Sequence, residues 1–131
     1  MTETGLTIEP SAPDVHAQNG AAEKARGVLQ VRGRKLKLQS NFPDHMEYYI
    51  FETAAYLLNR SPTRRLGWLS PLGKLQQLSG IRNPQPKLAY LHPYGCRAYT
   101  LRYDLNKLDR LESRVHISYL VGYESTNIFK I

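Results

Sequence analysis

The sequence contains a single cysteine, Cys96, in 131 residues. An intramolecular disulfide is therefore excluded, and the composition suits a reducing compartment. Long apolar runs are also missing, since no stretch approaches the roughly 20 apolar residues that span a bilayer. The first residues, 1–5, lack the basic and then apolar order of a secretion signal. We expect a nuclear or cytoplasmic protein without a membrane anchor.

Acidic residues are scarce. Eleven Asp and Glu stand against 18 Lys and Arg, which gives a formal charge of +7 and a pI of about 9.7. A basic chain favours a polyanionic partner, and nucleic acid is the first candidate. The alternative is that the charge serves solubility alone. Hydrophobic residues make up 41% of the chain, which is enough to form a globular core.

The apolar pattern predicts helices in the first part of the chain. A helix is expected from Asn19 or Gly20 to residue 40, although Gly27 and Gly33 each cost about 1 kcal/mol relative to Ala inside a helix. A second helix is expected over about 45–59, with an apolar face that includes Ile50 and Ala54. A third, short helix should begin after Ser70, which is followed by proline, and continue to residue 78.

The period of the pattern changes after residue 79. The stretch 80–87 contains Pro84 and Pro86 and is typical of a linker. Segments 96–103, 117–123 and 127–131 are rich in β-branched and aromatic residues, which predicts strands. We therefore expect an α+β protein divided into a helical part (1–79), a linker (80–92) and a β part (93–131).

Three segments, in this order, resemble one known family. They are Gln18-Asn19-Gly20 leading to Glu23, then the stretch 54–64 (AAYLLNRSPTR), and then 94–99 (YGCRAY) with 120–123 (LVGY). Each motif alone is weak, but together they resemble copia-type retrotransposon integrases. The resemblance implies the helical C-terminal half of an RNase H-like catalytic core, followed by a partial SH3-like β domain.

The resemblance assigns Glu23 as the third catalytic acid and as a metal ligand. The intact family uses two aspartates and one glutamate to hold two Mg²⁺ or Mn²⁺ ions, which lie about 3.5–4 Å apart in such sites. Both aspartates would precede residue 5, and Asp14 and Asp44 do not match their positions. We therefore expect no catalysis and no cofactor for the isolated chain. Glu23 could instead simply favour the helix N-terminus electrostatically.

The sequence departs from the family pattern in two places, and the first is His16 and Ala17, where the family usually has Pro and Gln. Glu47 stands where a buried Trp is common, and a charge at a packing position costs several kcal/mol unless it reaches water or a partner. Together with Gly27 and Gly33, this residue suggests a decaying copy.

Directly after Glu23, the segment from Lys24 to Lys37 contains six basic residues and no acidic one. On a helix they would form a positive surface for DNA phosphates, and the alternative is an ordinary solvated helix face. Gln18 and Asn19 are candidates for DNA contact as well, with helix capping as their alternative. The predicted DNA-binding set is Gln18, Asn19, Lys24, Arg26, Arg32, Arg34, Lys35 and Lys37.

Other residues are not assigned to a site. His92 and Cys96 lack the further ligands that zinc requires. Trp68 and several tyrosines could stack on bases, but we expect them to pack in the core. The predicted function is a nucleic-acid-binding remnant of an integrase that binds DNA, or alternatively RNA, without sequence preference. Two alternatives remain, a protein-interaction fragment that associates with itself or with intact integrase, and a relic without a selected role.

Overall fold

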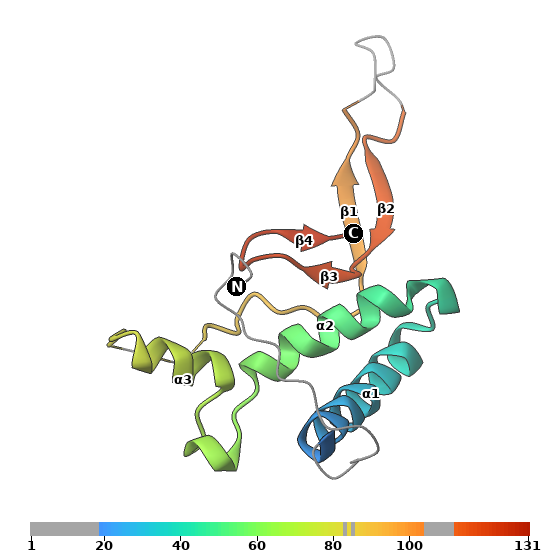
Figure 1. Cartoon of the computed structure of the whole chain (residues 1–131). Coiled ribbons are helices and arrows are strands. Elements are labelled where there is room, and N and C mark those ends of the chain that lie inside the picture. The colour runs from blue at the N-terminus through green and yellow to red at the C-terminus, as the bar shows by residue number, and fades with distance from the viewer. Residues whose placement is uncertain (1–18, 83, 85, 104–111) are drawn as a thin grey trace, which may run out of the picture.

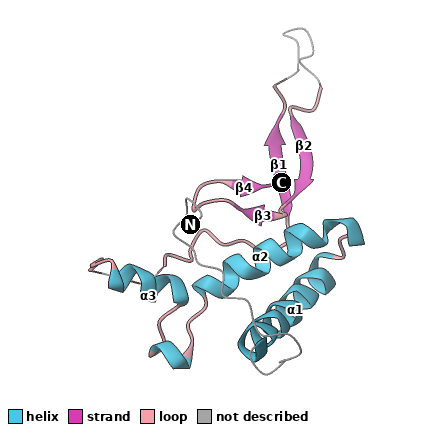
Figure 2. Cartoon of the chain, viewed as in Figure 1, coloured by secondary structure: helices cyan, strands magenta, loops and turns pink. Residues whose placement is uncertain are grey.

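The computed structural model describes residues 19–82, 84, 86–103 and 112–131. Helices come first and small antiparallel sheets follow, which confirms the α+β class (Figure 2). The predicted helical part (1–79) is described from Asn19 onward, and Gln18 lies outside the described residues. No helix in this described part combines the length and the apolar character needed to cross a bilayer.

The two long helices form where the sequence predicts them. Helix α1 spans Gly20–Ser40 and ends at Asn41, whose left-handed backbone (φ 53°) lets its N–H donate to the Lys37 carbonyl. A short 3-10 turn, η2 (Asp44–Met46), then leads into helix α2 (Glu47–Arg60). Asparagine tolerates this backbone conformation better than most residues, so Asn41 is a natural stop signal.

Gly33 lies where α1 and α2 pack against each other. A Cβ atom at this position would lie 2.9 Å from Cε1 of Phe51, whereas one at Gly27 would meet nothing within 4 Å. Gly33 therefore permits the close approach of the two helices, and its cost in helix propensity is offset by packing. The sequence interpretation of Gly33 as a sign of decay was wrong, while Gly27 has no such packing role.

The following elements are short. A 3-10 turn, η3 (Arg64–Leu66), precedes helix α3 (Pro71–Leu78). The predicted cap is confirmed, since Oγ of Ser70 accepts a hydrogen bond of 2.9 Å from the Gly73 N–H. The predicted linker packs closely against this helix at Gly73. The Pro84 carbonyl oxygen lies so near this glycine that a Cβ atom there would be only 2.1 Å from it.

The β part consists of two antiparallel pairs. Strand β1 (Arg97–Leu101) pairs with β2 (Val115–Tyr119), and β3 (Gly122–Tyr123) pairs with β4 (Phe129–Lys130). The β1–β2 hairpin projects away from the helices, and β3 and β4 lie between it and α2 (Figure 1). The register places apolar side chains on one face of the hairpin, and that face is exposed at Tyr99, Leu101, Val115 and Ile117.

Helix α2 packs on both sides. Its residues Ile50, Thr53 and Ala54 are buried. Oγ1 of Thr53 donates to the Val121 carbonyl at 3.2 Å. Other α2 side chains also contact the β part: the Tyr56 ring stacks on Tyr123, and Lys130 forms an ion pair of 2.6 Å with Glu52. Residues on both sides of the predicted linker therefore share one core.

Candidate nucleic-acid interface

Four of the predicted DNA-binding side chains are exposed on α1. They are Lys24, Arg26, Arg34 and Lys35, and none makes an ion pair within the described part of the chain. Lys24 and Lys35 are separated by about three helical turns, so they lie along one stripe of the helix, with Arg34 beside it. This arrangement leaves their charges available to a phosphate backbone.

Arg32 is oriented by a contact within the protein. Its Nη1 donates a hydrogen bond of 2.9 Å to Oγ of Ser61, the residue that follows α2. The Ser61 hydroxyl in turn donates to the Leu57 carbonyl at 2.8 Å. This contact joins the basic surface of α1 to the loop that carries Arg64 and Arg65.

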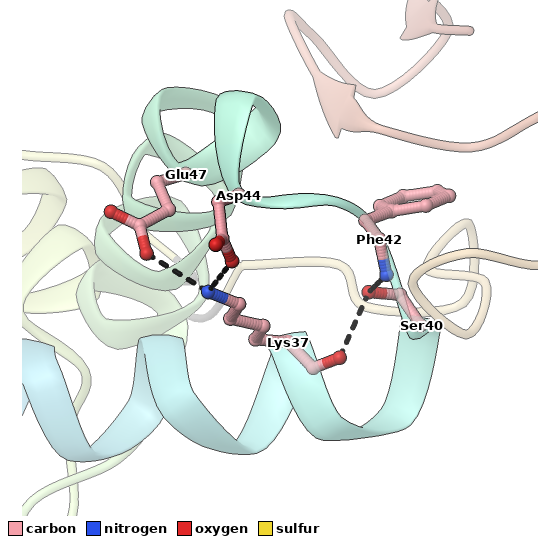
Figure 3. A network of polar contacts seen from close by, with 5 residues as sticks. All are labelled: Lys37, Ser40, Phe42, Asp44 and Glu47. Atoms are coloured by element: carbon pink, nitrogen blue, oxygen red, sulfur yellow. Dashed lines mark hydrogen bonds and ion pairs between the residues drawn. The ribbon is translucent and has the colours of Figure 1, made fainter.

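Lys37 is neutralised by two carboxylates. Its Nζ lies 2.5 Å from Oδ1 of Asp44 and 3.0 Å from Oε1 of Glu47, as Figure 3 shows. Hydrogen bonding to Asp44 and then to Glu47 raises the pKa of Lys37, and the same contact with Lys37 lowers the pKa of Asp44. Lys37 therefore offers less free charge to a phosphate than its neighbours on α1.

The Lys37 contacts also explain Glu47. Its side chain is exposed and paired with Lys37, so the burial cost expected for a charge at a packing position does not arise. Beside this ion pair, Oγ of Ser40 accepts a hydrogen bond of 3.4 Å from the Phe42 N–H (Figure 3). This contact fixes the turn between α1 and η2.

Glu23 lies exposed in the first turn of α1. No group of three or more His, Cys, Asp or Glu side chains that could hold a metal ion occurs among the described residues. Asn19 occupies the N-cap position, but its side chain makes no capping hydrogen bond there. His92 and Cys96 line the same cavity of about 430 Å³ beside β1, without the further ligands of a zinc site in the described chain.

A second basic and aromatic cluster was missed from the sequence. Arg60 lies 3.3 Å above the Tyr56 ring, and its Nε donates to the Tyr90 hydroxyl at 3.0 Å. Burial, and then the hydrogen bond with Tyr90, raise the pKa of Tyr56 to about 12. Arg64 and Arg65 follow on η3, both exposed. The sequence shows that Arg64 and Arg65 are neighbours. It does not show that Arg32 of α1 hydrogen-bonds Ser61, close to them in the chain.

The aromatic residues divide into two groups. Packing was predicted for all of them, and it is confirmed for Tyr94, which is 4% exposed and packs edge to face on Phe42. The prediction was wrong for Trp68, which is 69% exposed, for Tyr48, which is 71% exposed, and for Tyr99, which is 68% exposed.

Comparison with known proteins supplies the origin of the chain. It is 28% identical over 126 residues to the retrovirus-related Pol polyprotein from transposon RE2 of Arabidopsis thaliana, an alignment that covers 96% of this chain. It is 32% identical over 111 residues, or 83% of this chain, to the corresponding protein from transposon RE1 of the same plant. These matches support a copia-like retrotransposon origin. The retrotransposon-derived chain spans only 7–8% of the length of these relatives.

Two other comparisons give no match. No family model matches the chain, and no solved structure resembles it. The RNase H-like and SH3-like assignments of the two parts therefore remain predictions, as does the division at 80–92.

Proposed function

We propose that this retrotransposon-derived chain is a nucleic-acid-binding part of a copia-type integrase that binds duplex DNA without sequence preference. The observation that carries the proposal is the row of exposed basic side chains on α1, with Lys24, Arg34 and Lys35 on its outer side. Arg32 on the same helix hydrogen-bonds Ser61, which precedes the exposed Arg64 and Arg65 by a few residues in the sequence. Such side chains contact phosphates and displace counterions, which gives affinity without reading the bases.

The same proposal includes an incomplete catalytic site. Two metal ions require several oxygen ligands from different elements, and no group of three or more His, Cys, Asp or Glu side chains that could hold a metal ion occurs in the described part of the chain. As part of this proposal, the isolated chain acts without a cofactor, and a Mg²⁺ or Mn²⁺ pair would need ligands beyond those of the described residues. Glu23 would serve as a catalytic acid and metal ligand only beside aspartates supplied by other chain segments. The expected location is the nucleus or the cytoplasm.

The test of DNA binding is a titration of fluorescently labelled duplex DNA at several salt concentrations. Replacing Arg34 and Lys35 with Gln should make the slope of log affinity against log salt less negative by about 1.8, because two phosphate contacts are lost at about 0.9 each. The matched control replaces Arg97, at the start of β1, and Arg114, which directly precedes β2, in the same way, since both are exposed. An equal change in both variants, or none in the α1 variant, would contradict the proposed interface.

A second candidate function is association with another protein copy, either of this chain or of intact integrase. It is favoured by the exposed apolar face of the β1–β2 hairpin, on which Tyr99 is 68% and Ile117 is 62% exposed. A two-stranded hairpin is marginally stable unless one face is covered, so a partner on this face would stabilise it.

This association can be tested by sedimentation of the purified chain over a range of concentrations. Ile117→Lys should shift the protein toward monomer, because it places a charge in the apolar face. His116→Lys is the matched control, since neighbouring strand residues point to opposite faces. A wild-type protein that stays monomeric at high concentration and does not bind intact integrase would exclude this function.

A further inference from the structure

Trp68 is held outward by a constrained loop. Its backbone has a left-handed φ of 66°, directly after Gly67 with a φ of 64°. Left-handed backbone is unusual for a bulky residue, and it persists only where the surrounding structure enforces it. Here the Trp68 N–H donates to the Thr63 carbonyl at 3.0 Å, and the Thr63 N–H donates to the Leu69 carbonyl at 3.0 Å. These two hydrogen bonds close the loop and leave the indole 69% exposed.

The sequence on either side of Trp68 is basic and contains no acid. Arg64 and Arg65 belong to the same loop and are exposed. No Asp or Glu occurs from residue 53 through residue 103. The two arginines would repel cationic partners and attract anionic ones, and the exposed indole offers a flat face on which a ring of such a partner can stack.

A shallow cavity adjoins the indole. Its volume is about 150 Å³, below the roughly 300–1,000 Å³ of typical small-molecule sites. A cavity of this size accommodates the edge of one flat ring, with the ring face against the indole. It is lined by Arg60, Pro62, Trp68, Ser70, Pro86 and Leu88.

We propose that Trp68 stacks on an unpaired nucleobase, while Arg64 and Arg65 contact the phosphates on either side of it. Aromatic side chains in basic grooves bind single strands in this way, because every base offers a flat face whatever its sequence. The inference rests on the proposed nucleic-acid binding, and it adds a structural preference. A base-paired duplex keeps its bases stacked inside, so the Trp68 site selects strands that contain unpaired bases.

Trp68 is the only tryptophan of the chain, so its fluorescence reports directly on this site. The wild-type protein is titrated with a single-stranded DNA, the RNA of the same sequence, a blunt duplex, and an abasic strand of the same length and charge. Quenching of Trp68 emission is expected with the two single strands that carry bases, and little quenching with the blunt duplex or the abasic strand. The DNA and RNA titrations distinguish which of the two strands binds more tightly.

Variants extend the test through the anisotropy of labelled strands. Trp68→Leu should weaken binding of single-stranded DNA by roughly tenfold, whereas Trp68→Phe should retain most of the affinity because it keeps a flat ring. Tyr103→Leu removes another exposed aromatic side chain, 90% exposed on the hairpin, and should leave the affinity unchanged.

The outcomes separate this inference from the proposed function. Strands that bind by anisotropy but leave Trp68 emission unchanged, or an abasic strand that quenches as strongly, would refute base stacking and leave phosphate binding in place. Failure of every nucleic acid to bind would overturn both.

Discussion

The ion pairs of Lys37 limit the charge that this residue can offer to DNA. Because Asp44 and Glu47 already neutralise it, Lys37→Gln should change the salt dependence of DNA binding less than Lys35→Gln does. Conversely, replacing Asp44 with Asn and Glu47 with Gln should release Lys37 and strengthen DNA binding. Duplex titrations at several salt concentrations measure both effects. Equal slopes for the Lys37 and Lys35 variants would show that the ion pair does not survive in solution.

The same contact sets a pH dependence of the turn between α1 and α2. The pKa of Asp44 is lowered in the folded chain, so the stability from this pair is present at neutral pH. It is lost as the pH falls below the ordinary range of an aspartate, through the lowered pKa. The pKa of Lys37 is raised, so at the basic end the contribution persists until the pH passes above 10.5. Following the carboxyl resonance of Asp44 by NMR from neutral to acidic pH checks this order, and a midpoint at or above that of a free aspartate would contradict it.

Tyr94 carries a buried hydroxyl that has no hydrogen-bond partner among the described residues. Burial raises the pKa of Tyr94 to about 12. A buried polar group without a partner is destabilising, so Tyr94→Phe should raise the free energy of unfolding by up to about 1 kcal/mol. Urea denaturation measures the change, with the exposed Tyr99→Phe as control. A loss of stability would mean that the hydroxyl has a partner in solution.

The two glycines of α1 should respond to alanine in opposite ways. Gly27→Ala should stabilise the chain by roughly 0.5–1 kcal/mol, because its Cβ meets open space and alanine is a better helix former. Gly33→Ala should bring no such gain and should destabilise the chain, since its Cβ would lie 2.9 Å from the Phe51 ring. Denaturation of each variant, and of Gly33→Ala combined with Phe51→Ala, tests this. The second substitution should remove the clash, and a stabilising Gly33→Ala alone would contradict the close packing.

Local signals predicted the elements well and their surroundings poorly. Helix α3 begins at the Ser70 cap and α1 ends near its expected limit, because caps and turn residues act within a few positions of themselves. Strands β1 and β4 fall within the expected segments, whereas β2 begins two residues before the expected segment 117–123, which also contains β3. The close contact at Gly33 was missed because it depends on Phe51, which is distant in sequence. The exposure of Trp68 was missed because it depends on the backbone conformation of a hydrogen-bonded loop, which the apolar pattern does not specify. The basic residues lie on the predicted helix α1. The sequence did not show that Arg32 would bond Ser61, or that Lys37 would pair with Asp44 and Glu47.

The 131-residue chain, taken alone, should show no divalent-metal-dependent DNA cleavage or strand transfer. A single carboxylate such as Glu23 cannot hold two metal ions, and no cluster of ligands joins it in the described chain. Incubation with Mn²⁺ and a model DNA end, followed by gel analysis, measures this. Cleavage above background that disappears in Glu23→Gln would show that other acids complete the site.

Helix α2 packs between α1 and β3, so it should hold the molecule together when a protease cuts the backbone of the segment that connects the helices to the strands. Thr53, Tyr56 and Glu52 contact the β part directly, and Tyr90 of the connecting segment bonds the Tyr56 hydroxyl at 2.6 Å. Pro84 rests on α3 at the other end of that segment. A protease that nicks the backbone between these two anchors should therefore release neither piece. The chain would behave as a split protein, in which two separately made fragments recognise each other and restore the fold when they are mixed.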